Sequence, residues 1–171
     1  MTGAQLMQIM PLAGRRVTLF LVPLNAAMAE FGIDTPLRQA SFLAQAGHES
    51  GQLRYVRELA SGAAYEGRAD LGNVMTGDGV RFKGRGLLQV TGRINYAACG
   101  VALGIDLLTR PDLLEQTVLA CRSAGWFWQS RGLSRLADAG EQERITRRIN
   151  GGVHGLAERL ALFQTACRVL A

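Results

Sequence analysis

The chain has 171 residues, of which 48% are hydrophobic and 19% charged, enough for one substantial core but short for two full domains. This composition excludes a disordered or fibrous chain, and we expect a single domain over residues 1–171. The formal net charge of +5 favours an anionic partner, but the arginines are scattered rather than clustered in a stripe, so nucleic acid is not the expected partner.

The first part of the chain is expected to be helical. Residues 4–10 read as a short amphipathic turn that Pro11 interrupts, and residues 17–31 have the pattern of a helix that ends at Gly32. The segment RRVTLFLVPLNAAMA resembles a secretion signal, but it starts at residue 15 and contains a proline, so a core-facing helix is favoured. No apolar run approaches the ~18 residues that span a bilayer, and no membrane insertion is expected.

The segment DTPLRQASFLAQAGHESG marks the next helix most clearly. Thr35 can cap its first turn, Pro36 suits the first helical position, and Gly51 lies just past its end. Beyond it, glycines interrupt every apolar run up to residue 96, which excludes long helices there and leaves GLLQVTG as the only plausible strand, in a small hairpin. A loop region of this length inside a compact domain is usually functional or disordered, and its aromatics and paired charges argue against disorder.

Helices are expected to resume after residue 110. One begins at Pro111 and another, shorter one ends at INGG. The apolar face of the first carries Leu114, Val118, Cys121, Gly125 and Trp128, and the stripe of the last helix carries Leu156, Leu160, Phe163, Cys167 and Leu170. The predicted fold is therefore mainly α: a helical frame that holds a glycine-rich cleft.

Glu49 is the first candidate for chemistry. It lies seven residues after Phe42 and three after Ala46, so its carboxyl group continues an apolar stripe rather than a solvated face. At the last turn of a helix, desolvation and the negative end of the helix dipole favour the protonated form that a general acid needs. The alternative is an ordinary salt-bridged residue at a helix end.

Glu58, nine residues further on, is the candidate for the second carboxylate. Arg54 and Arg57 flank it and are expected to hold it ionised. A protonated and an ionised carboxyl facing each other across a cleft are the arrangement that glycoside hydrolysis uses. Alternatively, Glu58 forms a weak surface pair with Arg54, and Glu66 takes the catalytic place.

The segment FKGRGLLQVTGRINY adds possible ligand contacts. Gly84 and Gly86 allow close approach of the backbone to a ligand. Gln89 and Thr91 would point to the same side of a strand, where an amide and a hydroxyl can position a water or a sugar. The alternative is a polar strand face beside a tight turn.

Three segments together, AGHESG, GRGLLQVTGRINY and INGGVHGLAERLALF, resemble glycoside hydrolase family 19 in their order and spacing, most closely its phage endolysin branch. The resemblance covers nearly the whole chain and implies a lysozyme-like helical domain that hydrolyses β-1,4 links between N-acetylated aminosugars with inversion. It implies that Glu49 is the proton donor, that Glu58 is the second carboxylate and that Thr91 helps to hold the attacking water. The substrate contacts it implies are His48, Gln89, Asn95, Tyr96, Asn150 and Arg159.

Two of these residues have alternative roles. Asn150 can belong to a helix C-cap in the Asn-Gly-Gly sequence. Arg159 neighbours the apolar stripe of the last helix, and a buried arginine needs a partner, for which Glu49 or Glu58 would serve.

The chain departs from plant-type chitinases of the family in its short loops and in His154, which stands where those enzymes usually have Glu. Both departures favour peptidoglycan over crystalline chitin, so the expected function is that of a cell-wall lytic glycosidase. The alternatives are a chitinase acting on chito-oligosaccharides and a non-catalytic glycan- or DNA-binding module.

The remaining expectations concern cofactors, assembly and location. The three cysteines form no CxxC pair and are expected to be reduced core residues, and two histidines are too few for a His-rich site, so no metal or other cofactor is required. We expect a monomer. Without a credible signal, it would be made in the cytoplasm and would act on the wall after a holin opens the inner membrane or after delivery as a toxin.

Overall fold

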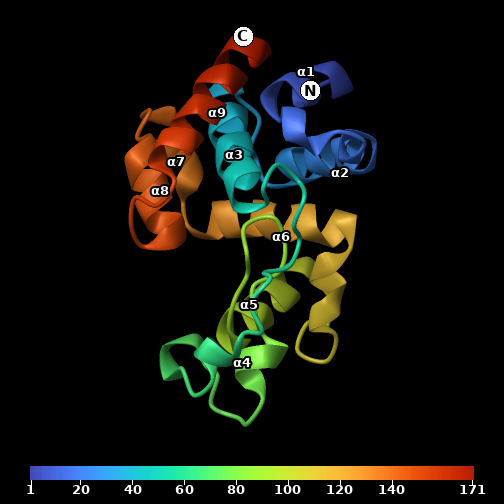
Figure 1. Cartoon of the computed structure of the whole chain (residues 1–171), viewed down its shortest axis with the longest axis vertical. Coiled ribbons are helices and arrows are strands. Elements are labelled where there is room, and N and C mark those ends of the chain that lie inside the picture. Colours follow the sequence, from blue (N-terminus) through green and yellow to red (C-terminus); the bar gives the residue numbers. More distant parts are fainter.

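Nine α-helices and four short 3₁₀ helices make up the computed structural model, which describes all 171 residues. The α-helices are α1 (Gly3–Ile9), α2 (Arg16–Glu30), α3 (Pro36–Glu49), α4 (Asp78–Arg81), α5 (Arg93–Leu103), α6 (Thr117–Ser130), α7 (Leu133–Asp138), α8 (Gln142–Asn150) and α9 (Leu156–Leu170). The 3₁₀ helices are Pro11–Ala13, Ala63–Tyr65, Ala69–Leu71 and Pro111–Glu115. In Figure 1, α6 crosses the molecule between a lobe of α1–α3 and α7–α9 and a second lobe that holds α4, α5 and the loops. The expected mainly helical fold is confirmed.

Helix α3 runs through the centre of the first lobe, packed along α9 (Figure 1). Its start is as predicted: the Thr35 hydroxyl accepts a hydrogen bond from the Arg38 backbone N–H at 3.2 Å, and Pro36 is the first helical residue. The helix ends at Glu49, and Gly51 after it takes a left-handed conformation with φ of 57°. Because α3 is buried on nearly all sides, the side chain of Glu49 is anchored to a helix of the core.

The signal-like segment lies in α2. This helix buries Val17, Phe20, Leu24, Ala27 and Met28 and packs against α6, so the core-facing interpretation is confirmed. None of the nine helices combines the length and the hydrophobicity that a membrane span requires.

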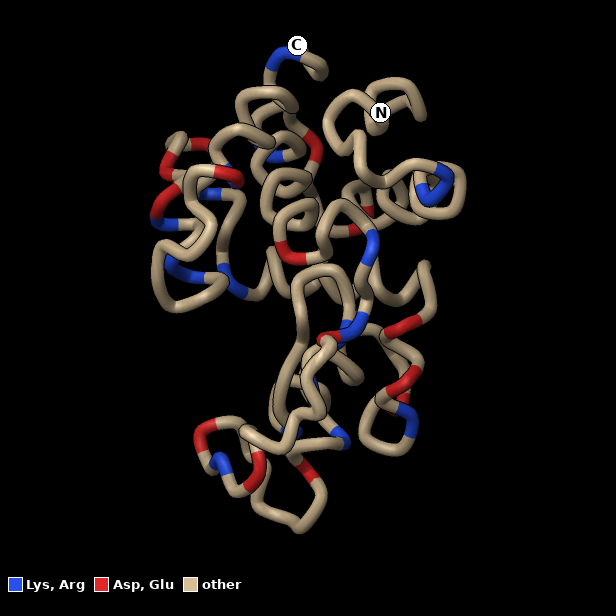
Figure 2. The backbone as a smooth tube through the Cα atoms, viewed as in Figure 1, with Lys and Arg blue, Asp and Glu red and all other residues tan.

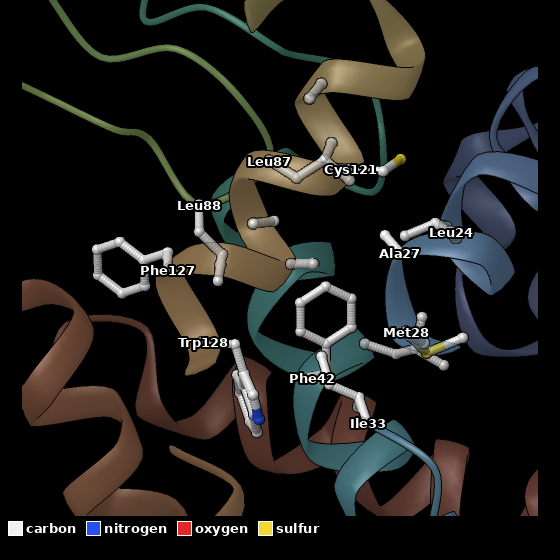
Figure 3. Packing of buried hydrophobic residues seen from close by; sticks show 14 of the residues in the cluster. Leu24, Ala27, Met28, Ile33, Phe42, Leu87, Leu88, Cys121, Phe127 and Trp128 are labelled. Carbon is white, nitrogen blue, oxygen red and sulfur yellow. The ribbon is translucent and has the colours of Figure 1, made fainter. Parts of the chain in front are cut away.

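One hydrophobic cluster extends through both lobes. At its centre the Phe42 and Trp128 rings meet edge to face, 5.5 Å apart (Figure 3). Leu87 and Leu88 of the loop region enter the same cluster, which fastens that loop to the helical frame. As expected, the three cysteines are free; burial raises the pKa of the thiols of Cys99 and Cys121 to about 12.

The predicted strand is wrong. Residues 85–90 form a tight turn in which Arg85 and Val90 exchange two backbone hydrogen bonds of 2.7 and 3.1 Å, and the only pairings in the region are isolated bridges. Positive φ angles of 84° at Gly86 and 50° at Gln89 fold the chain back before a strand can extend. The helix α5, of which only the first four residues fall in the expected loop region, was not predicted because Gly92, Gly100 and Gly104 break up its apolar pattern.

The predicted helices after residue 110 are largely correct. Pro111 begins a 3₁₀ helix rather than α6, which starts at Thr117. Val118 does not face the core, because it is 54% exposed. The most buried line of α9 is Arg159, Leu162 and Ala166, and the predicted apolar stripe flanks it half-buried.

Candidate active site

A cleft of about 350 Å³ lies where the end of α3 meets the loop region. Its walls include Glu49, Tyr55, Glu58, Tyr65, Gln89 and Thr91. The structure therefore brings together the two predicted carboxylates and the amide and hydroxyl predicted to act beside them. Both acids reach the same cleft from different supports, one from a helix and the other from a loop.

Glu49 is held by a buried arginine. Its Oε1 accepts a hydrogen bond from Nη2 of Arg159, a residue that is only 2% exposed, while the Glu49 side chain is 20% exposed to the cleft. Arg159 also donates to Oε1 of Gln45 at 2.5 Å and to the carbonyl oxygen of His154 at 3.1 Å. Glu49 is thus the partner that a buried Arg159 needs. The direct substrate contact expected of Arg159 is wrong, because the guanidinium group lies behind the carboxyl and is enclosed by protein.

The turn after α8 completes this support. Asn150 donates from Nδ2 to the His154 carbonyl at 3.1 Å and accepts from the Gly152 N–H at 2.9 Å, while Gly151 caps the helix in a left-handed conformation. The capping alternative therefore describes this segment. Asn150 orients the carbonyl group that helps to fix Arg159, and its expected substrate contact stays a prediction.

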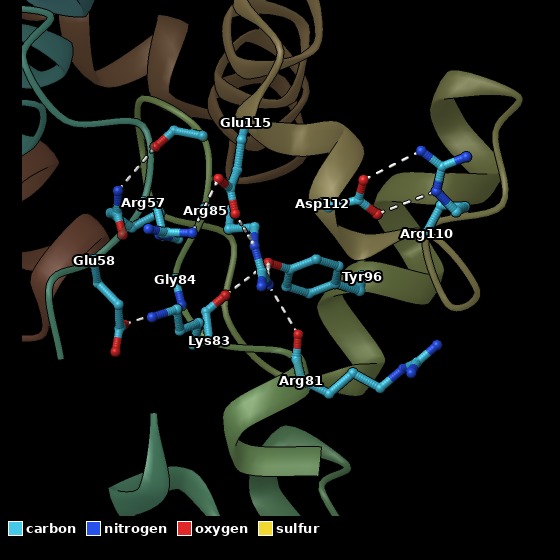
Figure 4. A network of polar contacts seen from close by, with 12 residues as sticks. Arg57, Glu58, Arg81, Lys83, Gly84, Arg85, Tyr96, Arg110, Asp112 and Glu115 are labelled. Atoms are coloured by element: carbon cyan, nitrogen blue, oxygen red, sulfur yellow. Dashed lines mark hydrogen bonds and ion pairs between the residues drawn. The ribbon is translucent and has the colours of Figure 1, made fainter. Parts of the chain in front are cut away.

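Glu58 is held by neutral donors. Its Oε2 accepts from the Tyr65 hydroxyl at 3.1 Å and from the Gly84 N–H at 3.0 Å (Figure 4), whereas Oε1 is buried and accepts no hydrogen bond from the protein. Burial and the bond to Glu58 raise the pKa of Tyr65, which keeps its hydroxyl a donor.

The expected pairing of Glu58 with neighbouring arginines is wrong. Arg57 reaches Glu115 at 3.4 Å instead, and Arg54 lies over the Tyr55 ring with 5.2 Å between the guanidinium carbon and the ring centroid. Of the two candidates for the second carboxylate, Glu58 lines the cleft. Glu66 does not, because both of its oxygens accept loop N–H groups.

Gly84 lies where three polar side chains of the cleft come close together. A Cβ atom at this position would lie 2.4 Å from Oε1 of Gln89, 2.7 Å from Oε2 of Glu58 and 3.3 Å from Oγ1 of Thr91. The backbone φ of Gly84 is not in the left-handed region, so glycine is needed here for space rather than for conformation. The first glycine of GRG thus allows three functional side chains to converge.

Beneath Gly84, a buried polar network fixes the loop. Arg85 donates to Oε1 of Glu115 at 2.8 Å and to the Tyr96 hydroxyl at 3.0 Å, and this hydroxyl donates to the Lys83 carbonyl at 2.6 Å (Figure 4). Tyr96 is fully buried, which raises the pKa of its hydroxyl. The substrate contact expected of Tyr96 is therefore wrong, and the residue supports the loop from inside.

The other two predicted substrate contacts, Asn95 and His48, lie in different places. Asn95 lies beside the cleft, where its Nδ2 donates to the Thr91 carbonyl at 2.7 Å. His48 does not line the cleft: its Nδ1 lies 2.8 Å from Oε2 of Glu158 and its ring fills the space beside Gly155. The substrate contact expected of His48 stays a prediction.

Strained backbone surrounds the cleft. Gln89, which lines it, has a φ of 50°, and Gln52 and Leu53, directly after α3, have φ values of 58° and 68°. Non-glycine residues rarely take this conformation, and such strain clusters at functional sites.

Comparison with known proteins identifies the family. The family model described as Chitinase class I, which is glycoside hydrolase family 19, matches residues 27–137. A Haemophilus influenzae protein described as a glycosyl hydrolase family 19 domain-containing protein is 33% identical over 172 residues, which cover 82% of this chain and 84% of that protein. The chain belongs to glycoside hydrolase family 19.

Other members of family 19 agree with this assignment. An Arabidopsis thaliana endochitinase is 36% identical over 114 residues, 66% of this chain but only 39% of the endochitinase. The crystal structure of a bacterial family 19 chitinase superimposes with a TM-score of 0.81 at 25% identity, covering 99% of this chain and 94% of the other. Chitinase C from Streptomyces griseus HUT6037 gives a TM-score of 0.80 at 24% identity over 99% of this chain and 76% of its own. The lysozyme-like fold implied by the resemblance is confirmed.

As a family 19 protein, the chain is a glycoside hydrolase with a polysaccharide substrate. The matched residues 27–137 include the whole wall of the cleft. Sequence reasoning found the two carboxylates but missed the role of Tyr65, which the segment AYEGR contains beside the rival Glu66. It expected Gly84 to allow close approach of the backbone to a ligand and did not foresee the space that Gly84 leaves for Glu58, Gln89 and Thr91, which only the fold brings around it.

Proposed function

We propose that this family 19 hydrolase is a cell-wall lytic glycosidase, of the endolysin type, that cleaves β-1,4 bonds in the glycan strands of bacterial peptidoglycan with inversion. Glu49 is the general acid, Glu58 the general base, and Thr91 positions the attacking water. The observation that carries the proposal is the meeting of these three side chains in one cleft. Inverting glycosidases hold their two carboxyl groups ~6.5–9.5 Å apart, so that a water fits between one of them and the sugar.

The contacts of each carboxyl group suit its proposed role. Glu49 gives its proton to the glycosidic oxygen as the bond to the leaving sugar breaks, and Arg159 then stabilises the carboxylate that remains. Glu58 lines the cleft, where its carboxylate takes a proton from the water that attacks the anomeric carbon, and the Tyr65 hydroxyl and the Gly84 N–H orient it through Oε2.

The substrate is proposed from the short loops and the charge. Loops shorter than those of plant-type chitinases would give a long crystalline polymer little support, and the net charge of +5 suits an anionic wall. Hydrolysis of chito-oligosaccharides is the second candidate, because the plant relatives are named endochitinases. In the proposed setting the enzyme is made in the cytoplasm and reaches the wall when a holin opens the inner membrane or after delivery into a competitor.

The test is digestion of purified sacculi and of chitin oligomers in parallel. Products are reduced with borohydride and analysed by mass spectrometry, which identifies the sugar that bears each new reducing end. We expect release of disaccharide-containing fragments from sacculi, and a loss of about 10²–10⁴-fold in rate for Glu49→Gln and for Glu58→Gln. Glu143→Gln, in an exposed pair with Arg147 on α8, is the control. Efficient digestion of chitin with no new reducing ends from sacculi would replace the proposal by the chitinase alternative, and normal rates for Glu49→Gln would end the catalytic assignment.

A further inference from the structure

A second pocket continues the cleft beyond Gln89 and Thr91, whose side chains line both spaces. It has a volume of about 200 Å³, and its wall includes Asn95, Arg131 and Arg148 but no Asp or Glu. We call it the arginine pocket. A substrate bound along the cleft can therefore place a substituent in a space whose only charged groups are cationic.

Each of the two arginines has a contact that positions its side chain. Arg131 follows the end of α6, and its guanidinium carbon lies 5.0 Å from the centroid of the Phe127 ring. Arg148, on α8, donates from Nη1 to the backbone carbonyl of Arg131 at 3.0 Å. The carbonyl bond and the ring contact fix both side chains at the pocket, although each residue is exposed to solvent.

Neither arginine forms an ion pair with an acidic side chain, in contrast to their neighbours on α8. Arg144 pairs with Glu141, and Arg147 with Glu143 at 2.8 Å. In Figure 2, Lys and Arg positions, in blue, lie along the part of α7 and α8 that faces the loop region. With two arginines and no acidic residue in its wall, the pocket is electrostatically suited to an anion that approaches along the cleft.

Carboxylates fit this donor set. A guanidinium group binds a carboxylate through two parallel N–H···O bonds, and most donors of both groups are free for such bonds. Chitin carries no carboxylate on its sugars. In peptidoglycan, every second sugar carries a lactyl ether whose carboxyl group is either free or joined to a peptide with carboxylates of its own.

We infer that the arginine pocket binds a carboxylate on the acidic substituent of the glycan and so selects muramic-acid-containing strands over neutral ones. This inference rests on the proposed function, because it names what distinguishes the substrate of the same cleft. Arg131 and Arg148 are specificity residues that contact the substituent and not the bond that breaks.

The test compares three forms of one glycan. The first form is peptide-bearing strands. The second is strands freed of peptide, in which the lactyl carboxyl group is ionised. The third is made from the second by carbodiimide-mediated reduction of that carboxyl group to an alcohol, so all three have the same sugars and links. Initial rates with each form are measured for the wild type, for the variant Arg131→Gln/Arg148→Gln and for Arg144→Gln/Arg147→Gln. The last variant also removes two positive charges, but from residues outside the pocket.

We expect the ratio of kcat/KM for the carboxylate form to that for the reduced form to fall about tenfold in the pocket variant and to stay unchanged in the control. A fall seen only with peptide-bearing strands identifies the peptide carboxylates as the bound group, and one seen with the peptide-free strands identifies the lactyl group. Equal losses on all forms, or equal losses in both double variants, would overturn the inference.

Calorimetric titration of the Glu49→Gln protein with the peptide-free and the reduced strands separates this inference from the proposed function. If the Glu49→Gln protein prefers the carboxylate form and loses this preference when it also carries Arg131→Gln/Arg148→Gln, the binding role of the pocket is supported even if the wild type fails to cleave sacculi. If binding shows no preference for the carboxylate form, the pocket has no such role, whatever bond the enzyme cuts.

Discussion

The two lobes are stabilised in different ways. In the helical lobe, α3 is surrounded by apolar side chains, and the Phe42–Trp128 contact lies at the centre of the shared core. In the loop region, residues 51–92, charged and polar side chains tie short turns together, as Asp78 does with Arg93 and Glu66 with two loop N–H groups. Each lobe contributes one carboxyl group to the cleft.

This difference indicates how precision is achieved at the cleft. The position of the Glu49 backbone is set by the packed helix α3, and the hydrogen bond from Arg159 orients its carboxyl group. Glu58 comes from a loop and is positioned by hydrogen bonds with residues from distant parts of that loop. Damage to the helical side should therefore cost stability, whereas damage near Glu58 should cost mainly activity.

The largest effect is expected from Arg159→Met. This change leaves Glu49 and Gln45 without their common donor in a buried place, and removing one partner of a buried ion pair costs about 3 kcal/mol of unfolding free energy. Urea denaturation measures it, with Arg168→Met on the exposed face of α9 as the control. The double variant Glu49→Gln/Arg159→Met should lose less stability than the sum of the single variants. Strict additivity would show that the two side chains are not coupled.

A smaller loss is expected from Asp78→Asn in the loop region. Asp78 is 1% exposed and accepts two hydrogen bonds from Arg93, of 2.5 and 2.8 Å, and one from the Met75 N–H at 3.1 Å. Losing the charge-assisted bonds should cost about 2 kcal/mol. Asp70→Asn, which breaks an exposed pair with Arg68, is the matched control and should change stability much less.

The Asp78 effect should also depend on pH. The hydrogen bond from Arg93 lowers the pKa of Asp78 below its ordinary value. The native state therefore binds this proton less readily than the unfolded state, so the stabilisation is present above the ordinary pKa of about 3.9 and is lost as pH falls through the lowered value. The difference between wild type and Asp78→Asn in unfolding experiments should shrink over that acidic range. A difference that stays constant down to pH 2 would contradict this account.

The sequence predicted the helical side of the site far better than the loop side. Thr35 and Pro36 predict the start of α3, and the apolar stripe through Phe42 and Ala46 predicts the side of the helix on which Glu49 lies. These signals are local in the sequence and can be recognised without the fold. The partners of Glu58 are not local: Gly84 is 26 residues away, and no periodicity relates the two. Family resemblance located Tyr96 and Arg159 as important residues but not the direction of their side chains, which depends on what packs around them. Both lie behind the cleft.

The last effect, from Gly84→Ala, should appear in catalysis and only weakly in stability. The new methyl group would meet the ends of the Glu58 and Gln89 side chains and the hydroxyl of Thr91, and such flexible groups move aside at lower cost than backbone does. They include the proposed base and the proposed water-positioning hydroxyl, so displacing them should lower kcat/KM about tenfold, equivalent to ~1.4 kcal/mol. Gly3→Ala, whose Cβ meets only ordinary contacts at 3.5 Å or more, is the control. A fully active Gly84→Ala enzyme would mean that Glu58 and Thr91 tolerate displacement, which a base and a water-positioning hydroxyl do not.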